Sequence, residues 1–62
     1  MFQSDMVVAD YDFVPQEPNE LPFKRGDIIT IINRDHQHWW KGELNGKQGL
    51  LPSTYVSILL VV

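Results

Sequence analysis

The segment HQHWWK, residues 36–41, brings together the histidines and the tryptophans of this 62-residue chain. His36 and His38 would share one face of an extended segment, and a His-x-His pair can bind a metal ion. The sequence shows no third ligand, so we expect exposed loop histidines and neither a metal nor another cofactor. Trp39 and Trp40 are adjacent, and neighbouring residues of a strand point to opposite faces. One face of a sheet cannot bury both indoles, so one tryptophan is left for another role.

The sequence offers little for catalysis. The chain has no cysteine, no convincing set of nucleophile, histidine and carboxylate, and too little mass for a deep pocket. Residues 42–48, GELNGKQ, resemble a phosphate-binding loop only superficially, because the segment is one residue short and lacks a Ser or Thr after Lys47. We therefore predict that the chain is not an enzyme.

The charge of the chain argues against nucleic acid as a ligand. Eight acidic and five basic side chains give a formal net charge of −3, whereas phosphate binding needs a clustered positive surface. The N-terminal residues lack the pattern of a secretory signal, and the apolar run at 58–62 is shorter than the roughly 20 residues that span a bilayer. With the absence of cysteine, these features predict a cytoplasmic protein that binds neither nucleic acid nor membrane.

Short strands separated by turns are the elements that must position these side chains. Four prolines break the chain repeatedly and disfavour helices. Runs of β-branched and aromatic residues predict strands at 6–9, 27–32, 38–44, 47–51 and 55–59. The third and fourth strands would be joined by a type I′ turn, because Asn45 and Gly46 tolerate the positive φ that both of its central positions need. Five strands in one small domain predict an all-β fold, either a compact antiparallel barrel or a sandwich.

Alternation within residues 27–32, DIITII, predicts part of the core. Thr30 would face water, so Ile29 and Ile31 would face the core, while Ile28 and Ile32 would share the face of Thr30. The segment that follows the first strand, residues 11–27, is proline-rich and acidic in its first half. It is about as long as a connection becomes in a compact domain without being functional or disordered.

Four blocks of the sequence resemble signatures of the Src homology 3 (SH3) domain family. The family's signatures are ALYDY, ELSFKKGD, and WW followed by GxxPSNYV. The matching blocks are residues 9–13 (ADYDF), 20–27 (ELPFKRGD), 39–40 (WW) and 49–56 (GLLPSTYV). They stand in the family's order and at its separations, over about residues 6–58 of the chain.

The resemblance implies one SH3-like domain over residues 1–62. Its fold would be a small five-stranded antiparallel barrel. The loops and turns implied are a long RT loop (10–27), an n-Src loop (33–38), a distal hairpin at Asn45-Gly46 and a short 3₁₀ turn at 53–55.

The resemblance also implies a function, the docking of proline-rich peptides of the PxxP type in a polyproline II conformation. Carried over position by position, the groove would be formed by Tyr11, Phe13, Trp39, Pro52 and Tyr55. Glu20 and Glu17 would contact a ligand Arg or Lys, and Asp35 could extend this acidic patch. The Trp39 ring would pack on a ligand proline and donate its Nε1–H, while Trp40 would cover the other side of the sheet.

Three positions depart from the family's pattern. Phe13 lacks the usual hydroxyl, Thr54 replaces the usual Asn, and Leu50 stands where an aromatic residue is common. We expect hydrogen bonding along the groove to be reduced or rearranged.

Other ligands remain as alternatives to a proline-rich peptide. The same fold could bind an atypical peptide without the PxxP pattern, or a folded protein such as ubiquitin. In the family, ubiquitin binding is associated with Phe at the position of Tyr55, so the tyrosine speaks against it. A barrel that stacks nucleic-acid bases on the same aromatic side chains is opposed by the acidic residues nearby. We expect a module that recruits partners within a larger signalling, cytoskeletal or trafficking protein.

An apolar tail, residues 58–62, runs past the end of the family's usual last strand. It would either fold back on Met1, Phe2 or Met6 of the same molecule, or offer an apolar edge to a second copy. We expect the first outcome and a monomer, because association between chains has an additional entropic cost. A dimer formed through the tail is the alternative.

Overall fold

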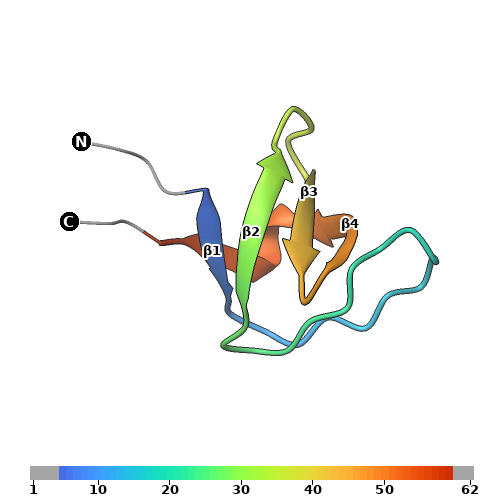
Figure 1. Cartoon of the computed structure of the whole chain (residues 1–62), viewed down its shortest axis with the longest axis horizontal. Helices are drawn as coiled ribbons and strands as arrows, with labels where there is room; N and C mark the ends of the chain where they lie inside the picture. The colour runs from blue at the N-terminus through green and yellow to red at the C-terminus, as the bar shows by residue number, and fades with distance from the viewer. Residues whose placement is uncertain (1–4, 60–62) are drawn as a thin grey trace.

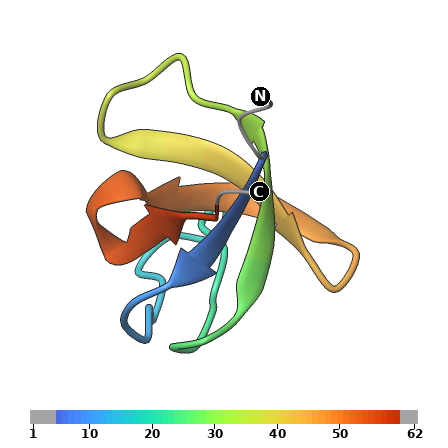
Figure 2. The same ribbon diagram turned by 90° about the vertical axis from the view of Figure 1, so that its left-hand side faces the viewer.

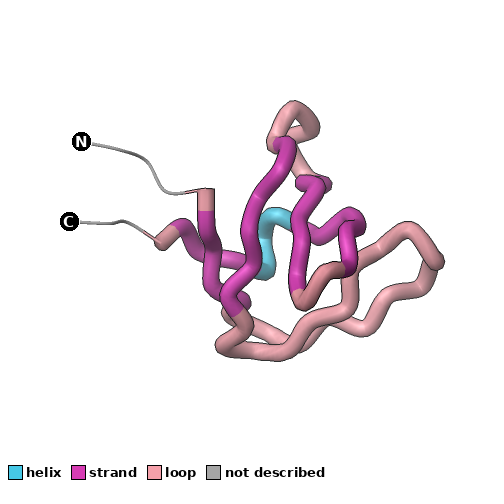
Figure 3. Tube along the Cα trace, in the orientation of Figure 1, coloured by secondary structure: helices cyan, strands magenta, loops and turns pink. Residues whose placement is uncertain are grey.

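The structure, a computed structural model, describes residues 5–59 and contains one sheet of antiparallel strands (Figure 1). The strands are β1 (Met6–Ala9), β2 (Ile28–Asn33), β3 (Trp39–Leu44), β4 (Lys47–Pro52) and β5 (Val56–Ile58). A 3₁₀ turn, η1 (Ser53–Tyr55), joins β4 to β5 (Figure 3). The order in the sheet is β4-β3-β2-β1-β5, so the first strand lies beside the last. The predicted all-β class and the 3₁₀ turn are confirmed.

Strong curvature lets this single sheet enclose a small core. In Figure 2, β1 and β2 run steeply while β3 and β4 lie across them. Ile29 and Ile31 are 0% and 6% exposed, whereas Ile28 and Ile32 are 43% and 47% exposed, which confirms the alternation predicted for β2. A register shift between Ile31 and Asn33 interrupts the pairing of β2 with β3, and such a bulge increases local bending and twist.

The hairpin between β3 and β4 sets the register that the site depends on. Asn45 and Gly46 have φ angles of 54° and 81°, the positive values predicted for the turn. From this turn the pairing runs without interruption to Trp39, which lies opposite Pro52. The first residue of β3 is thereby fixed beside the last residue of β4.

β1 has the predicted bounds, and the other four strands differ from the predicted ones by one residue at one or both ends. β3 begins at Trp39 and not at His38, whose main-chain N–H donates to the Nδ1 atom of His36. β5 begins at Val56 because Tyr55 belongs to η1.

The RT loop, residues 10–27, is an irregular hairpin that extends from the sheet (Figure 1). Its two arms are joined by hydrogen bonds between the main chains of Phe13 and Phe23, at 2.8 and 3.3 Å. Its return arm pairs with β4, since the N–H of Leu21 donates to the carbonyl of Leu50 at 2.7 Å. Leu21 and Phe23 are buried, and they join the core with Val7, Ala9, Ile29, Ile31 and Leu51. The loop therefore completes the core and covers the edge of β4.

The end of the described chain continues the pairing of β5 with β1. The N–H of Leu59 donates to the carbonyl of Met6 at 3.0 Å. The predicted packing of the tail on Met1 or Phe2, and the alternative dimer, involve residues 1–4 and 60–62, which lie outside the described residues. Between residues 5 and 59, no helix is long and apolar enough to cross a bilayer.

Candidate functional site

Four aromatic side chains form a continuous row between the RT loop and the strands. The Tyr11 and Tyr55 ring centroids are 5.6 Å apart, those of Tyr55 and Phe13 are 5.7 Å apart, and those of Phe13 and Trp39 are 6.3 Å apart. All three pairs meet edge to face, with interplanar angles of 73°, 80° and 62°. Edge-to-face contact is a favourable geometry for aromatic pairs, so each ring of the row stabilises the position of its neighbour.

Three separate parts of the chain position this row. Trp39 stands at the start of β3, and Tyr55 ends η1 and accepts a hydrogen bond from the N–H of Asp10 at 2.8 Å. Phe13 is held by its main-chain pairing with Phe23 and by a ring contact with that residue at 5.4 Å. The RT loop and the end of the β3–β4 hairpin must therefore both fold before the row exists.

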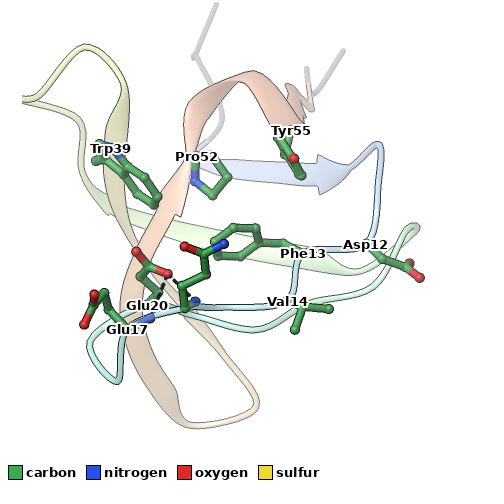
Figure 4. A pocket seen from close by; sticks show the side chains of 9 residues that line it. Asp12, Phe13, Val14, Glu17, Glu20, Trp39, Pro52 and Tyr55 are labelled. Carbon is green, nitrogen blue, oxygen red and sulfur yellow. Dashed lines mark hydrogen bonds between the residues drawn. The ribbon is translucent and has the colours of Figure 1, made fainter.

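Three members of the row, Phe13, Trp39 and Tyr55, line an open groove of about 590 Å³. In Figure 4, Trp39, Pro52 and Tyr55 lie along one side, and Val14, Glu17 and Glu20 of the RT loop lie along the other. The complete lining consists of Asp12, Phe13, Val14, Gln16, Glu17, Glu20, Trp39, Pro52 and Tyr55. An apolar floor with an acidic rim suits an extended ligand that carries a positive charge.

The two glutamates of the rim are held differently. The Oε1 atom of Glu20 accepts hydrogen bonds from the main-chain N–H groups of Gln16, at 2.9 Å, and Glu17, at 3.3 Å (Figure 4). These bonds close the tip of the RT loop and leave Oε2 for a ligand. The Glu17 side chain is exposed, and its carboxylate forms no hydrogen bond or ion pair within the described part of the chain. Glu20 is thus fixed in place, whereas Glu17 must be ordered by whatever it binds.

Hydrogen-bond donors lie on the apolar side of the groove. Within residues 5–59, neither the Trp39 indole N–H nor the Tyr55 hydroxyl bonds another group of the chain. Phe13 stands between them in the row and has no polar atom on its side chain. Thr54 is exposed on η1. Its side chain is shorter than that of the asparagine usual at this position in the family. The groove offers donors at two points with an apolar stretch between them.

Most of the predicted site residues are brought together in the structure. Six of them line the groove, namely Phe13, Glu17, Glu20, Trp39, Pro52 and Tyr55. Tyr11 extends the aromatic row through Tyr55 without lining the groove itself. Asp35 is not among the lining residues, and its carboxylate accepts a hydrogen bond from the Nδ2 atom of Asn33 at 3.2 Å. The role of each residue in binding stays a prediction.

Sequence reasoning missed three lining residues, Asp12, Val14 and Gln16. Asp12 also joins the two arms of the loop, because its Oδ1 atom accepts from the N–H of Arg25 at 2.8 Å. The acidic character of the segment was the only available signal for Asp12. Val14, which is 83% exposed, had none, because an irregular loop has no period that assigns its side chains to a face.

The two adjacent tryptophans lie on opposite faces of β3, as predicted. Trp39 lines the groove, whereas Trp40 packs against the hydrophobic core. The Arg34 guanidinium carbon lies 5.1 Å from the centroid of the Trp40 ring, a cation–π contact on the partly exposed indole. The histidines nearby do not form a metal centre with other residues, since no cluster of three His, Asp or Glu side chains with ligand geometry occurs among residues 5–59.

The fold and groove match one family of known proteins. The sequence model of the SH3 domain matches residues 8–53, and the chain belongs to this family. The SH3 domain of myosin IB from Entamoeba histolytica, solved with a bound peptide, superposes with a TM-score of 0.87 at 47% identity. That comparison covers 97% of this chain and 100% of the other. SH3 domains are non-catalytic modules that bind peptides, which agrees with the groove described above.

Relatives among full-length proteins are much longer than this chain. The class E vacuolar protein-sorting machinery protein HSE1 of Mycosarcoma maydis is 47% identical over 53 residues, which are 86% of this chain and 9% of the relative. The myosin IC heavy chain of Acanthamoeba castellanii is 45% identical over 51 residues, which are 82% of this chain and 4% of the relative. The chain thus spans less than a tenth of the length of these relatives.

Proposed function

We propose that this chain binds proline-rich peptides in the polyproline II conformation, with a basic ligand residue at the acidic rim. The observation that carries the proposal is the convergence of Phe13, Trp39, Pro52 and Tyr55 on one groove whose opposite side holds Glu17 and Glu20. An apolar surface alone would suit many ligands. The carboxylates across from it favour an extended peptide with a positive charge at one end.

The shape and donors of the groove suit a polyproline II ligand in particular. Such a peptide is already extended and has unpaired carbonyl groups, so little conformational entropy is lost when it binds. Its ridges can pack between the side chains of the aromatic row, while the Trp39 indole N–H and the Tyr55 hydroxyl donate to ligand carbonyls. Because Phe13 has no donor, we expect fewer hydrogen bonds at the centre of the groove and a larger share of binding from apolar contact.

Electrostatic selection at the rim gives the first testable prediction. Glu20→Gln should lower the affinity for an arginine-containing proline-rich peptide about twofold to fivefold, the size expected for a partly exposed charge pair. Glutamine keeps an oxygen that can accept from Gln16 and Glu17, so the change removes the charge while keeping the loop tip. Glu17→Gln should have a smaller effect, since its exposed side chain loses more freedom on binding. Affinity can be measured by isothermal titration calorimetry at low and high salt.

Two controls make this measurement specific. Glu43→Gln removes an exposed carboxylate of β3 that does not line the groove, and it should leave affinity unchanged. The wild-type affinity should also fall with added salt and on replacing the ligand arginine by alanine. Equal binding of the arginine and alanine peptides would show that the acidic rim does not contact the ligand.

The setting of the module is part of the proposal. Relatives that carry a similar domain include vacuolar sorting proteins, myosin heavy chains and intersectin. We propose that the chain acts as a recruiting module of a larger cytoplasmic protein engaged in signalling, the cytoskeleton or trafficking. We further propose that residues 1–62 form a single domain, which works as a monomer and binds neither nucleic acid nor membrane. The cover of the β4 edge by the RT loop and the short β5 support the monomer.

A further inference from the structure

The ring of His36 holds the main chain at the start of β3. Its Nδ1 atom accepts hydrogen bonds from the N–H groups of His38 and Trp39, both at 3.1 Å. The chain on the other side of this bend is tied to η1, because Ser53 donates from its N–H to the carbonyl of His38 and from Oγ to the carbonyl of Gln37, both at 2.9 Å. The imidazole therefore closes the turn from which Trp39 enters the groove.

This arrangement requires the neutral form of the ring. A nitrogen that accepts hydrogen bonds must carry no proton, so the ring proton is on Nε2. In the charged imidazolium both ring nitrogens are donors, and the Nδ1–H would then face two further N–H groups. The contacts with His38 and Trp39 would be lost and replaced by repulsion. Histidine is the side chain whose charge ordinarily changes between about pH 5 and 8.

We propose that His36 is a positioning residue of the peptide groove, whose neutral ring holds the main chain of Trp39 and whose protonation weakens peptide binding. The inference rests on the proposed function for its binding readout. The direction follows from the contacts: the hydrogen bonds are present while the ring is neutral, and they are lost as the pH falls and the ring gains its proton.

Charged neighbours of the ring are few. The His38 ring centroid lies 6.0 Å away, so two charged imidazoles would add repulsion to the lost hydrogen bonds. Within the loop, Asp35 is bonded to Asn33 and Arg34 lies against Trp40. The loop is bonded to Ser53 of η1, and residues 49–54 around it include no acidic or basic residue. The first charged residue of β3 is Lys41. Across the groove from Trp39 are Glu17 and Glu20.

Three variants separate the hydrogen bonds from the charge. In His36→Asn, the Oδ1 atom can accept in place of Nδ1 but does not titrate, so affinity at pH 7.5 should be kept and its fall on acidification should disappear. In His36→Ala the acceptor is lost, so affinity at pH 7.5 should fall by a factor of about 3 to 10, as for the loss of hydrogen bonds of this kind. His38→Asn is the matched control: it removes the repulsion between the two rings but keeps the His36 acceptor, so it should retain most of the wild-type pH dependence.

The experiment is a series of titrations with an arginine-containing proline-rich peptide between about pH 5.5 and 7.5, the range in which histidine charge changes. Wild-type affinity should fall about threefold to tenfold across it. A pH dependence that persists in His36→Asn, or that vanishes in His38→Asn, would overturn the inference. So would unchanged affinity of His36→Ala at pH 7.5.

A measurement without peptide distinguishes failure of this inference from failure of the proposed function. In nitrogen NMR spectra of the free wild-type protein, the neutral His36 ring should carry its proton on Nε2, and the amide signals of His38 and Trp39 should shift as His36 titrates. A proton on Nδ1 of the neutral ring would overturn the inference whatever the peptide results. Absence of peptide binding to the wild type at every pH would instead refute the proposed function.

Discussion

Replacement of Trp39 by alanine is expected to abolish measurable peptide binding while the domain still folds. The Trp39 ring is part of the groove lining, packs edge to face on Phe13, and presents an indole N–H that no described group of the chain uses. Truncation of an aromatic anchor of this kind commonly costs about 2 kcal/mol or more, a loss of at least roughly thirtyfold in affinity. The core is built from other residues, so folding should survive.

The comparison should be made on folded protein. Thermal unfolding followed by circular dichroism would establish that Trp39→Ala is folded, and calorimetric titration with a proline-rich peptide would give its affinity. Ile32→Ala serves as the control, because Ile32 is an exposed apolar residue, 47% accessible, that does not line the groove. This variant should bind as the wild type does. A folded Trp39→Ala protein with unchanged affinity would refute the assignment of the groove.

Gly49→Ala is expected to destabilise the domain by about 1–3 kcal/mol, the usual cost of overpacking a tight contact. A Cβ atom on Gly49 would lie 3.0 Å from the nitrogen of Leu21, 3.1 Å from the carbonyl oxygen of Asn19 and 3.1 Å from the carbonyl carbon of Glu20. All three are main-chain atoms of the RT loop, which cannot rotate away as a side chain would. The loop must move off β4, which weakens the 2.7 Å hydrogen bond between Leu21 and Leu50 and loosens the packing of the buried Leu21.

The same displacement should affect the site. Glu20 belongs to the arm that moves, so binding of an arginine-containing peptide should weaken along with stability. Urea unfolding gives the free energy of unfolding, and Gln48→Ala, at the exposed neighbouring position of β4, is the matched control, with a change of about 0.5 kcal/mol or less. If the two variants unfolded with the same free energy, close approach of the loop to Gly49 would not matter to the fold.

Features set by local patterns could be predicted from the sequence. The alternation of DIITII placed Ile29 and Ile31 in the core, and the residue types of Asn45 and Gly46 predicted positive φ at both positions. Opposite faces for Trp39 and Trp40 followed from strand geometry alone. Each of these features depends on residues that are close together in the sequence, so the sequence of one chain is enough to predict it.

Features set by contacts between distant segments could not be predicted in this way. Leu21 and Phe23 enter the core because the return arm of the RT loop pairs with β4 and with its own outgoing arm. The course of the same loop also brings Val14 and Gln16 to the groove. Asp35 was assigned to the acidic patch by its charge; it does not line the groove and bonds Asn33 in the turn that follows β2, so its contact with a ligand stays a prediction.

The central claim is that a proline-rich peptide occupies the groove between the aromatic row and the acidic rim. Its most direct test is nitrogen–proton NMR of the labelled wild-type domain during titration with an arginine-containing proline-rich peptide. The largest shift changes should fall on the Trp39 indole N–H, on the amide of Tyr55 and on residues 16–20 of the RT loop. Changes confined to the exposed outer face of β2, at Ile28 and Ile32, with Trp39 unaffected, would contradict the account.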